Sequence, residues 1–183
     1  SMHGLQTWLA LPKTHEDIAP DFLHHPEESL PKFEKDGANV RVLAGTAWGH
    51  KSPVIFPWDL LYVAIEAPTG ASLILPANLA EERGVYLVSG AASIEGETYE
   101  EGSMIVLSPQ ADVPITLETG AKVMVCGGAP MDGKRLIDWN FVASDQEKIS
   151  QAVADWKTSE ASGGDNKRFP AVPGDESEHI PYN

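Results

Sequence analysis

The residues with the clearest chemical signature lie between Gly70 and Gly90. In this segment the glycines and the glutamate of a metal-binding motif are present, but its histidines are not. The motif has the form G-x5-H-x-H-x3-E, followed by a glycine. Its two histidine positions hold Pro76 and Asn78, whereas Glu82 is in place. Oxygenase-type metal sites need two or more imidazoles and a carboxylate, and proline has no side-chain donor. The segment therefore predicts no metal ligand and no catalytic residue.

A second motif, G-x5-P-x-G-x2-H, aligns with the chain from Gly102 and also lacks its metal ligand. Pro109 arrives one position late, so the expected histidine falls on Pro114, or on Ile115 in the shifted register. Neither side chain can bind a metal ion. The sequence predicts that both motif segments shape the fold without supplying a metal site.

Four residues remain as candidates to line a metal-free pocket. Asn78 and Glu82 are positions of the first motif, Tyr86 follows it, and His50 lies in G-T-A-W-G-H-K-S-P, a loop between expected strands. The densest histidine cluster is the pair His24 and His25, but adjacent residues on extended chain point in opposite directions. We interpret that pair as part of a solvated loop.

Length, charge and cysteine content limit the classes of function. The chain has 183 residues, 42% of them apolar, which suits one domain or one domain with a tail. Its 27 acidic and 13 basic side chains give a formal charge of −14, which disfavours direct binding to nucleic acid or to an anionic membrane. The single cysteine, Cys126, in a strand-like segment, predicts a buried thiol and a reducing, cytoplasmic setting.

Most of the chain reads as short β-strands separated by glycine and proline turns, which favours an all-β jelly roll or barrel. The turn E-G-E-T at residues 95–98 predicts a tight hairpin, and the opening segment Leu5–Leu11 also alternates like a strand. The other expected strands are Asn39–Ala44, Leu60–Glu66, Ser72–Leu75, Val85–Ser89, Ser103–Leu107, Ile115–Glu118 and Lys122–Cys126.

One helix is expected near the C-terminus. Ser144 and Glu147 have the spacing of a capping box, and an apolar stripe follows at helical spacing. The stripe consists of Ile149, Ala152, Val153 and Trp156. The chain then divides into a leading strand and surface linker (1–38), a β-barrel (39–128), a connector with the helix (129–158), and a flexible linker with a docking tail (159–183).

Three stretches together resemble the pirin family of bicupin proteins. They are H-G-L-Q-T-W-L-A-L-P at the start, the segment 70–109, and G-G-A-P-M-D with the helix that follows; the ending F-P-A-V-P-G-D-E is also similar to bacterial members. The resemblance implies a cupin-type antiparallel jelly roll. It also implies non-haem iron, held by three histidines and a glutamate in a first barrel. In the family, the G-L-Q-x-W segment comes after that barrel. By this alignment the chain corresponds to the second half, and we expect no cofactor in it.

Three functions stay open on these grounds. The first is a non-catalytic interaction or regulatory module of the pirin type. The second is part of a quercetin 2,3-dioxygenase-type enzyme whose iron lies in a half absent here. The third is a metal-free cupin that binds a small molecule. We also expect a homodimer, because Leu5, Trp8 and Leu9 would otherwise face water.

Overall fold

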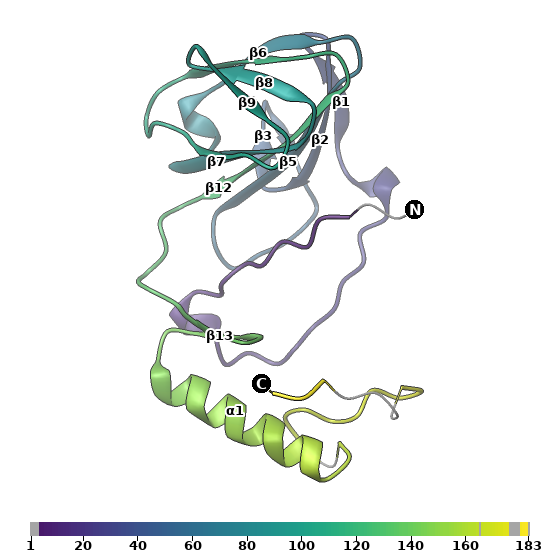
Figure 1. Cartoon of the computed structure of the whole chain (residues 1–183), viewed down its shortest axis with the longest axis vertical. Helices are drawn as coiled ribbons and strands as arrows, with labels where there is room; N and C mark the ends of the chain where they lie inside the picture. Colours follow the sequence, from purple (N-terminus) through teal and green to yellow (C-terminus); the bar gives the residue numbers. More distant parts are fainter. Residues whose placement is uncertain (1–3, 165, 176–179, 183) are drawn as a thin grey trace. The chain divides into compact units, whose positions relative to one another are not determined.

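The computed structural model describes residues 4–164, 166–175 and 180–182, and the chain divides into two compact units. One unit is Ala19–Pro130, and the other combines Ser1–Ile18 with Met131–Asn183. We call them the jelly-roll unit and the helical unit and describe each by itself (Figure 1).

The jelly-roll unit is built from two antiparallel sheets (Figure 1). The six-stranded sheet has the order β1-β2-β5-β12-β7-β10, with β1 (Lys32–Lys35), β2 (Ala38–Ala44), β5 (Leu60–Ala67), β12 (Ala121–Gly128), β7 (Glu82–Ser89) and β10 (Met104–Val106). The four-stranded sheet has the order β6-β11-β8-β9, with β6 (Ala71–Leu75), β11 (Val113–Leu117), β8 (Ala91–Ile94) and β9 (Glu97–Glu100). Smaller elements are the hairpin β3 (Thr46–Ala47) and β4 (His50–Lys51), and the 3-10 turns η2 (Glu27–Ser29) and η3 (Ala77–Leu79).

Period-two alternation builds the core between these sheets. In β2, the side chains of Val40 and Val42 are fully buried, and in β5 the same holds for Val63 and Ile65. Alternate side chains of a strand point to opposite faces, so each strand contributes one apolar face. The expected all-β jelly-roll class is therefore confirmed, and every strand predicted from Asn39 onward is present with small shifts at its ends.

The predicted hairpin at residues 95–98 is also present. Glu95 and Gly96 connect β8 to β9 with φ angles of 52° and 88°, the left-handed pair that a two-residue type I′ turn requires. The predicted strand at Leu5–Leu11 is wrong. This segment is irregular and, within the part of the chain that the structure describes, joins no sheet. Alternation alone does not make a strand, because a strand also needs a ladder partner.

The helical unit packs α1 (Gln146–Ala161) on the hairpin of β13 (Leu136–Asp138) and β14 (Phe141–Ala143). The apolar stripe behaves as predicted, since Ile149 and Ala152 are buried. The predicted cap is one residue early, because Asp145 is the N-cap and its Oδ1 accepts from the amide of Glu147 at 2.6 Å. The helix also continues past residue 158 to Ala161. Within the described residues, no helix is long and apolar enough to cross a membrane.

Aromatic side chains join the C-terminal tail to this helix. The ring of Trp156 lies 5.4 Å from that of Phe169 and 5.1 Å from that of Trp139, which in turn lies 5.8 Å from Tyr182. The Tyr182 hydroxyl donates to Asp138 Oδ2 at 2.8 Å. Edge-to-face rings at these separations bury large apolar areas, so the tail is part of the small core of this unit.

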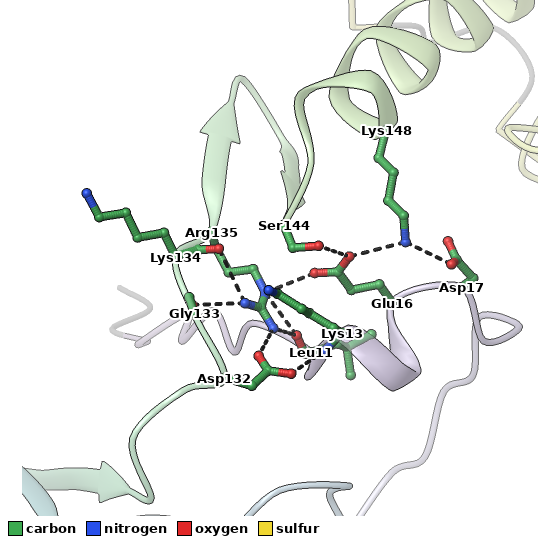
Figure 2. A network of polar contacts seen from close by, with 10 residues as sticks. All are labelled: Leu11, Lys13, Glu16, Asp17, Asp132, Gly133, Lys134, Arg135, Ser144 and Lys148. Atoms are coloured by element: carbon green, nitrogen blue, oxygen red, sulfur yellow. Dashed lines mark hydrogen bonds and ion pairs between the residues drawn. The ribbon is translucent and has the colours of Figure 1, made fainter.

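A network of ion pairs fixes η1 (Lys13–His15) to the hairpin and helix of the same unit (Figure 2). The Glu16 carboxylate, only 6% exposed, lies 2.9 Å from Arg135 Nε and 3.2 Å from Lys148 Nζ, and it accepts from the Ser144 hydroxyl at 2.8 Å. Arg135 also donates to the Leu11 carbonyl at 2.8 Å. Ser144 thus binds a distant carboxylate and does not act as the helix cap.

Candidate functional site

The main cavity of the jelly-roll unit is a surface cleft of about 1030 Å³. It is bordered by the segment between β3 and β5, by η3 with the residues after it, and by the end of β12. Its polar side chains include Lys51, Asp59 and Asn78, and its aromatic side chains are Phe56 and Trp58. Trp58 is held by a 3.1 Å hydrogen bond from its indole nitrogen to the carbonyl of Ala129. The cleft is open to solvent, and its lining mixes polar side chains with these two aromatic side chains.

Of the four residues proposed to line a pocket, Asn78 is the one that borders this cleft. Glu82 is exposed at the start of β7, and Tyr86 is half-buried on the same strand. Both have the opposite parity to the buried Val85 and Leu87, so they lie on the face of the sheet turned away from the core.

The fourth candidate, His50, is exposed and stacks on Phe33, with ring centroids 4.0 Å apart. Its neighbour Lys51 borders the cleft, while His50 does not. The structure therefore does not bring the four residues together, and their shared role stays a prediction.

Arg83 is the residue that the sequence reasoning missed. It is 3% exposed and lies on the core side of β7, between the two motif segments. One guanidinium nitrogen, Nη1, donates to the carbonyls of Leu75 at 3.0 Å and Pro76 at 2.6 Å. The other, Nη2, donates to the carbonyls of Ser108 at 3.1 Å and Ala111 at 2.6 Å. The guanidinium therefore joins the end of β6 and the following loop to the loop between β10 and β11.

Two further features tighten this end of the fold. The Asp112 carboxylate accepts from the amide of Ala77 at 2.8 Å, which links the same two loops a second time. At the end of β12, a Cβ on Gly127 would lie 2.1 Å from the carbonyl oxygen of Glu82, closer than any side chain tolerates. Glycine is therefore required there for β7 and β12 to approach each other.

The family resemblance implies iron in a first barrel, and the residues at the motif positions of this chain do not fit such an ion. Pro76 has no donor, Asn78 offers only an amide, and Glu82 lies on the outer face of its strand. The buried charge between the motif segments is the cationic guanidinium of Arg83, which disfavours a metal cation beside it. Among the described residues, no group of three or more His, Cys, Asp and Glu side chains is placed to hold a metal ion.

The sequence did contain a signal for Arg83. It has the same parity as Val85 and Leu87 in β7, so the period-two pattern places it inside the fold. An arginine at a core position must be satisfied by acceptors, and main-chain carbonyls of neighbouring loops provide them here.

Cys126 is half-buried, and its sulfur lies 3.8 Å from the carbonyl oxygen of Gly84. Burial raises the pKa of the thiol above its usual value, which keeps it protonated at neutral pH. The sequence predicted a buried thiol, and the structure corrects this to a half-buried one, because Cys126 lies near the end of β12 (Ala121–Gly128), on the opposite parity to the buried Val123 and Val125.

Comparison with known proteins agrees with this geometry. Residues 62–162 match the family model described as the pirin C-terminal cupin domain. The chain belongs to the pirin family. Pirin-like protein of Caulobacter vibrioides is 41% identical over 85% of this chain and 54% of its own length. Human Pirin is 27% identical over 86% of this chain and 56% of its own length.

The structural comparison places this pirin-family chain beside a related solved enzyme. The crystal structure of quercetin 2,3-dioxygenase from Acinetobacter baumannii matches 96% of this chain and 58% of that chain, with a TM-score of 0.82 and 28% identity. The chain spans about half the length of the curated relatives that it matches. The pirin and cupin assignments made from the sequence are therefore confirmed.

Proposed function

We propose that this chain is a pirin-type cupin domain without catalytic chemistry of its own, acting as an interaction or regulatory module. One observation carries the proposal. In the jelly-roll unit, the buried polar side chains among the described residues are Ser52 and Arg83, and both bind main-chain groups. The interior of the fold is otherwise aliphatic, so the groups that could transfer a proton or hold a metal lie outside it.

The test is metal content by elemental mass spectrometry on untagged protein, combined with oxygen uptake in the presence of quercetin and added iron(II). We expect substoichiometric metal and no oxygen uptake above the rate without protein. Near-stoichiometric iron, nickel or zinc would overturn the proposal, and so would enzyme-dependent oxygen uptake by this chain alone.

A second candidate is supported by the greater length of the relatives and by the similarity to the solved quercetin 2,3-dioxygenase. If the native protein carries a preceding metal-bearing half, the full-length molecule is better described as a quercetin 2,3-dioxygenase-type enzyme. The gene sequence upstream of Met2 discriminates between the two readings. An H-x-H segment there favours the enzyme, and a stop codon favours the module.

A third candidate is a small-molecule-binding cupin, and the cleft of about 1030 Å³ supports it. Thermal-shift assays with flavonols and small organic acids test this reading. Saturable stabilisation that is lost in Asn78→Ala but kept in Glu82→Ala would support binding in the cleft, because only Asn78 borders it. No shift across the ligands counts against it.

We also propose that the chain forms a homodimer through the opening apolar face, defined as Leu5, Trp8 and Leu9. Their side chains are 45%, 52% and 51% exposed, although all three are large and apolar. Burying such a face is favourable by about 25 cal/mol per Å² of apolar area, and a two-fold arrangement lets one face cover its copy.

A further inference from the structure

We propose that Arg83 replaces a metal ion as the cross-link between the two motif loops of this cupin, so that the guanidinium performs structurally what ligand-bearing cupins obtain from a bound metal. The inference rests on the proposed function, since it assumes a jelly roll without a metal. It adds the residue that holds the two loops in position.

The first step of the argument is connectivity. The β6–β7 loop (residues 76–81) belongs to the first motif, and the β10–β11 loop (residues 107–112) belongs to the second. Arg83 Nη1 binds Leu75 and Pro76 at the first loop, and Nη2 binds Ser108 and Ala111 at the second. Each half of the planar fork therefore serves one motif, as the donors of a guanidinium are arranged to do.

The second step is charge. Arg83 is only 3% exposed, and its guanidinium donates to carbonyl oxygens from both loops and pairs with no carboxylate among the residues that the structure describes. A buried cation is costly unless hydrogen bonds replace its hydration. The carbonyl oxygens provide those bonds to Nη1 and Nη2, whereas the buried Nε has no hydrogen-bond partner among the described residues. The same positive charge opposes the entry of a divalent cation at this place.

The third step is geometry at the neighbouring amides. Besides the Asp112 to Ala77 contact, the amide of Leu79 donates to the Pro76 carbonyl at 3.2 Å and the amide of Leu107 donates to the Arg83 carbonyl at 2.9 Å. The Leu79 amide reports on the first loop, the Leu107 amide on the second, and the Ala77 amide on the contact between the two. If the guanidinium holds both loops, its removal must release all three reporters together.

The test compares Arg83→Met with the wild-type chain by hydrogen exchange of the Ala77, Leu79 and Leu107 amides. We expect exchange at all three to be at least about tenfold faster, the factor that corresponds to one lost charge-assisted hydrogen bond. The thermal midpoint should fall by about 4 °C or more. Unchanged exchange at either loop would overturn the inference.

Lys122→Met is the matched control, because it removes one positive charge from the neighbouring strand β12. Lys122 is 53% exposed and pairs only at the surface with Glu66. Lys122→Met should leave the exchange rates of the three amides unchanged. Similarly faster exchange in Lys122→Met would show that the loss of a positive charge, and not the loss of the Arg83 cross-link, causes the effect.

If Arg83→Met does not fold, the same exchange experiment is made with Arg83→Lys. A single ammonium cannot place donors toward both loops as a planar fork does, so exchange should rise at one loop at least. Wild-type protection at both loops in Arg83→Lys would overturn the inference. Metal content of the wild-type chain tests the proposed function separately, so each failure appears in its own measurement.

Discussion

At the residue scale, Glu16 has the most demanding environment in the helical unit. Its carboxylate is 6% exposed and lies between the cations of Arg135 and Lys148. Glu16→Gln removes the carboxylate that both cations share, but Arg135 keeps Asp132 and Lys148 keeps Asp17, so we expect the free energy of unfolding to fall by about 2 kcal/mol. Denaturant titration measures this. The control Asp17→Asn removes an exposed partner of Lys148 and should change stability by less than about 1 kcal/mol.

The same network predicts how stability depends on pH. Burial raises the pKa of Glu16, but hydrogen bonds from Ser144 and Lys148 and the charges of Lys148 and Arg135 outweigh it, so the pKa lies below its usual value. Hydrogen bonds from Arg135 and the Lys13 amide lower the pKa of Asp132. Both carboxylates therefore bind fewer protons in the folded state than in the unfolded state.

It follows that their contribution is present at neutral pH and is lost as pH falls below about 4, through the lowered pKa values. The hydrogen bond to Asp17 raises the pKa of Lys148, so its contribution is lost only in strongly alkaline solution. Trp139 and Trp156 report on this unit by fluorescence. We expect the stability of Glu16→Gln to decrease less steeply with falling pH than that of the wild-type chain. The same pH dependence in both chains would contradict the lowered pKa of Glu16.

At the element scale, the N-terminus of α1 depends on Asp145 and not on Ser144. Asp145 Oδ1 accepts from the Glu147 amide, one of the helix donors that lack an intrahelical partner. Asp145→Ala should therefore cost about 1 kcal/mol and reduce helicity measured by circular dichroism. Ser144→Ala should leave helicity unchanged, because the Ser144 hydroxyl binds Glu16. Equal loss of helicity in the two variants would show that Ser144 also caps the helix, as the capping-box spacing predicts.

At the scale of the whole molecule, the homodimer proposal predicts that the opening apolar face forms the contact between two copies of the chain. We expect light scattering at micromolar concentration to give a dimer for the wild-type chain and a monomer for the double variant Trp8→Ser and Leu9→Ser. Ile137→Ser is the control, since Ile137 is 69% exposed but lies outside that face. A monomeric wild-type chain would refute the homodimer proposal.

Sequence alone determined most strands of the jelly roll and the residue types at the motif positions, because alternation, glycine turns and donor chemistry are local properties; the pirin assignment came from resemblance over several stretches. The alternation at Leu5–Leu11 misled because a strand also needs a ladder partner. Tertiary structure decided what lies between the motifs, since the partners of Arg83 come from loops up to Ala111, 28 positions away in the chain. It also decided that Ser144 binds Glu16, 128 positions away. A side chain that can bind either its own turn or a distant group takes the partner that folding brings near, and no local pattern encodes that distance.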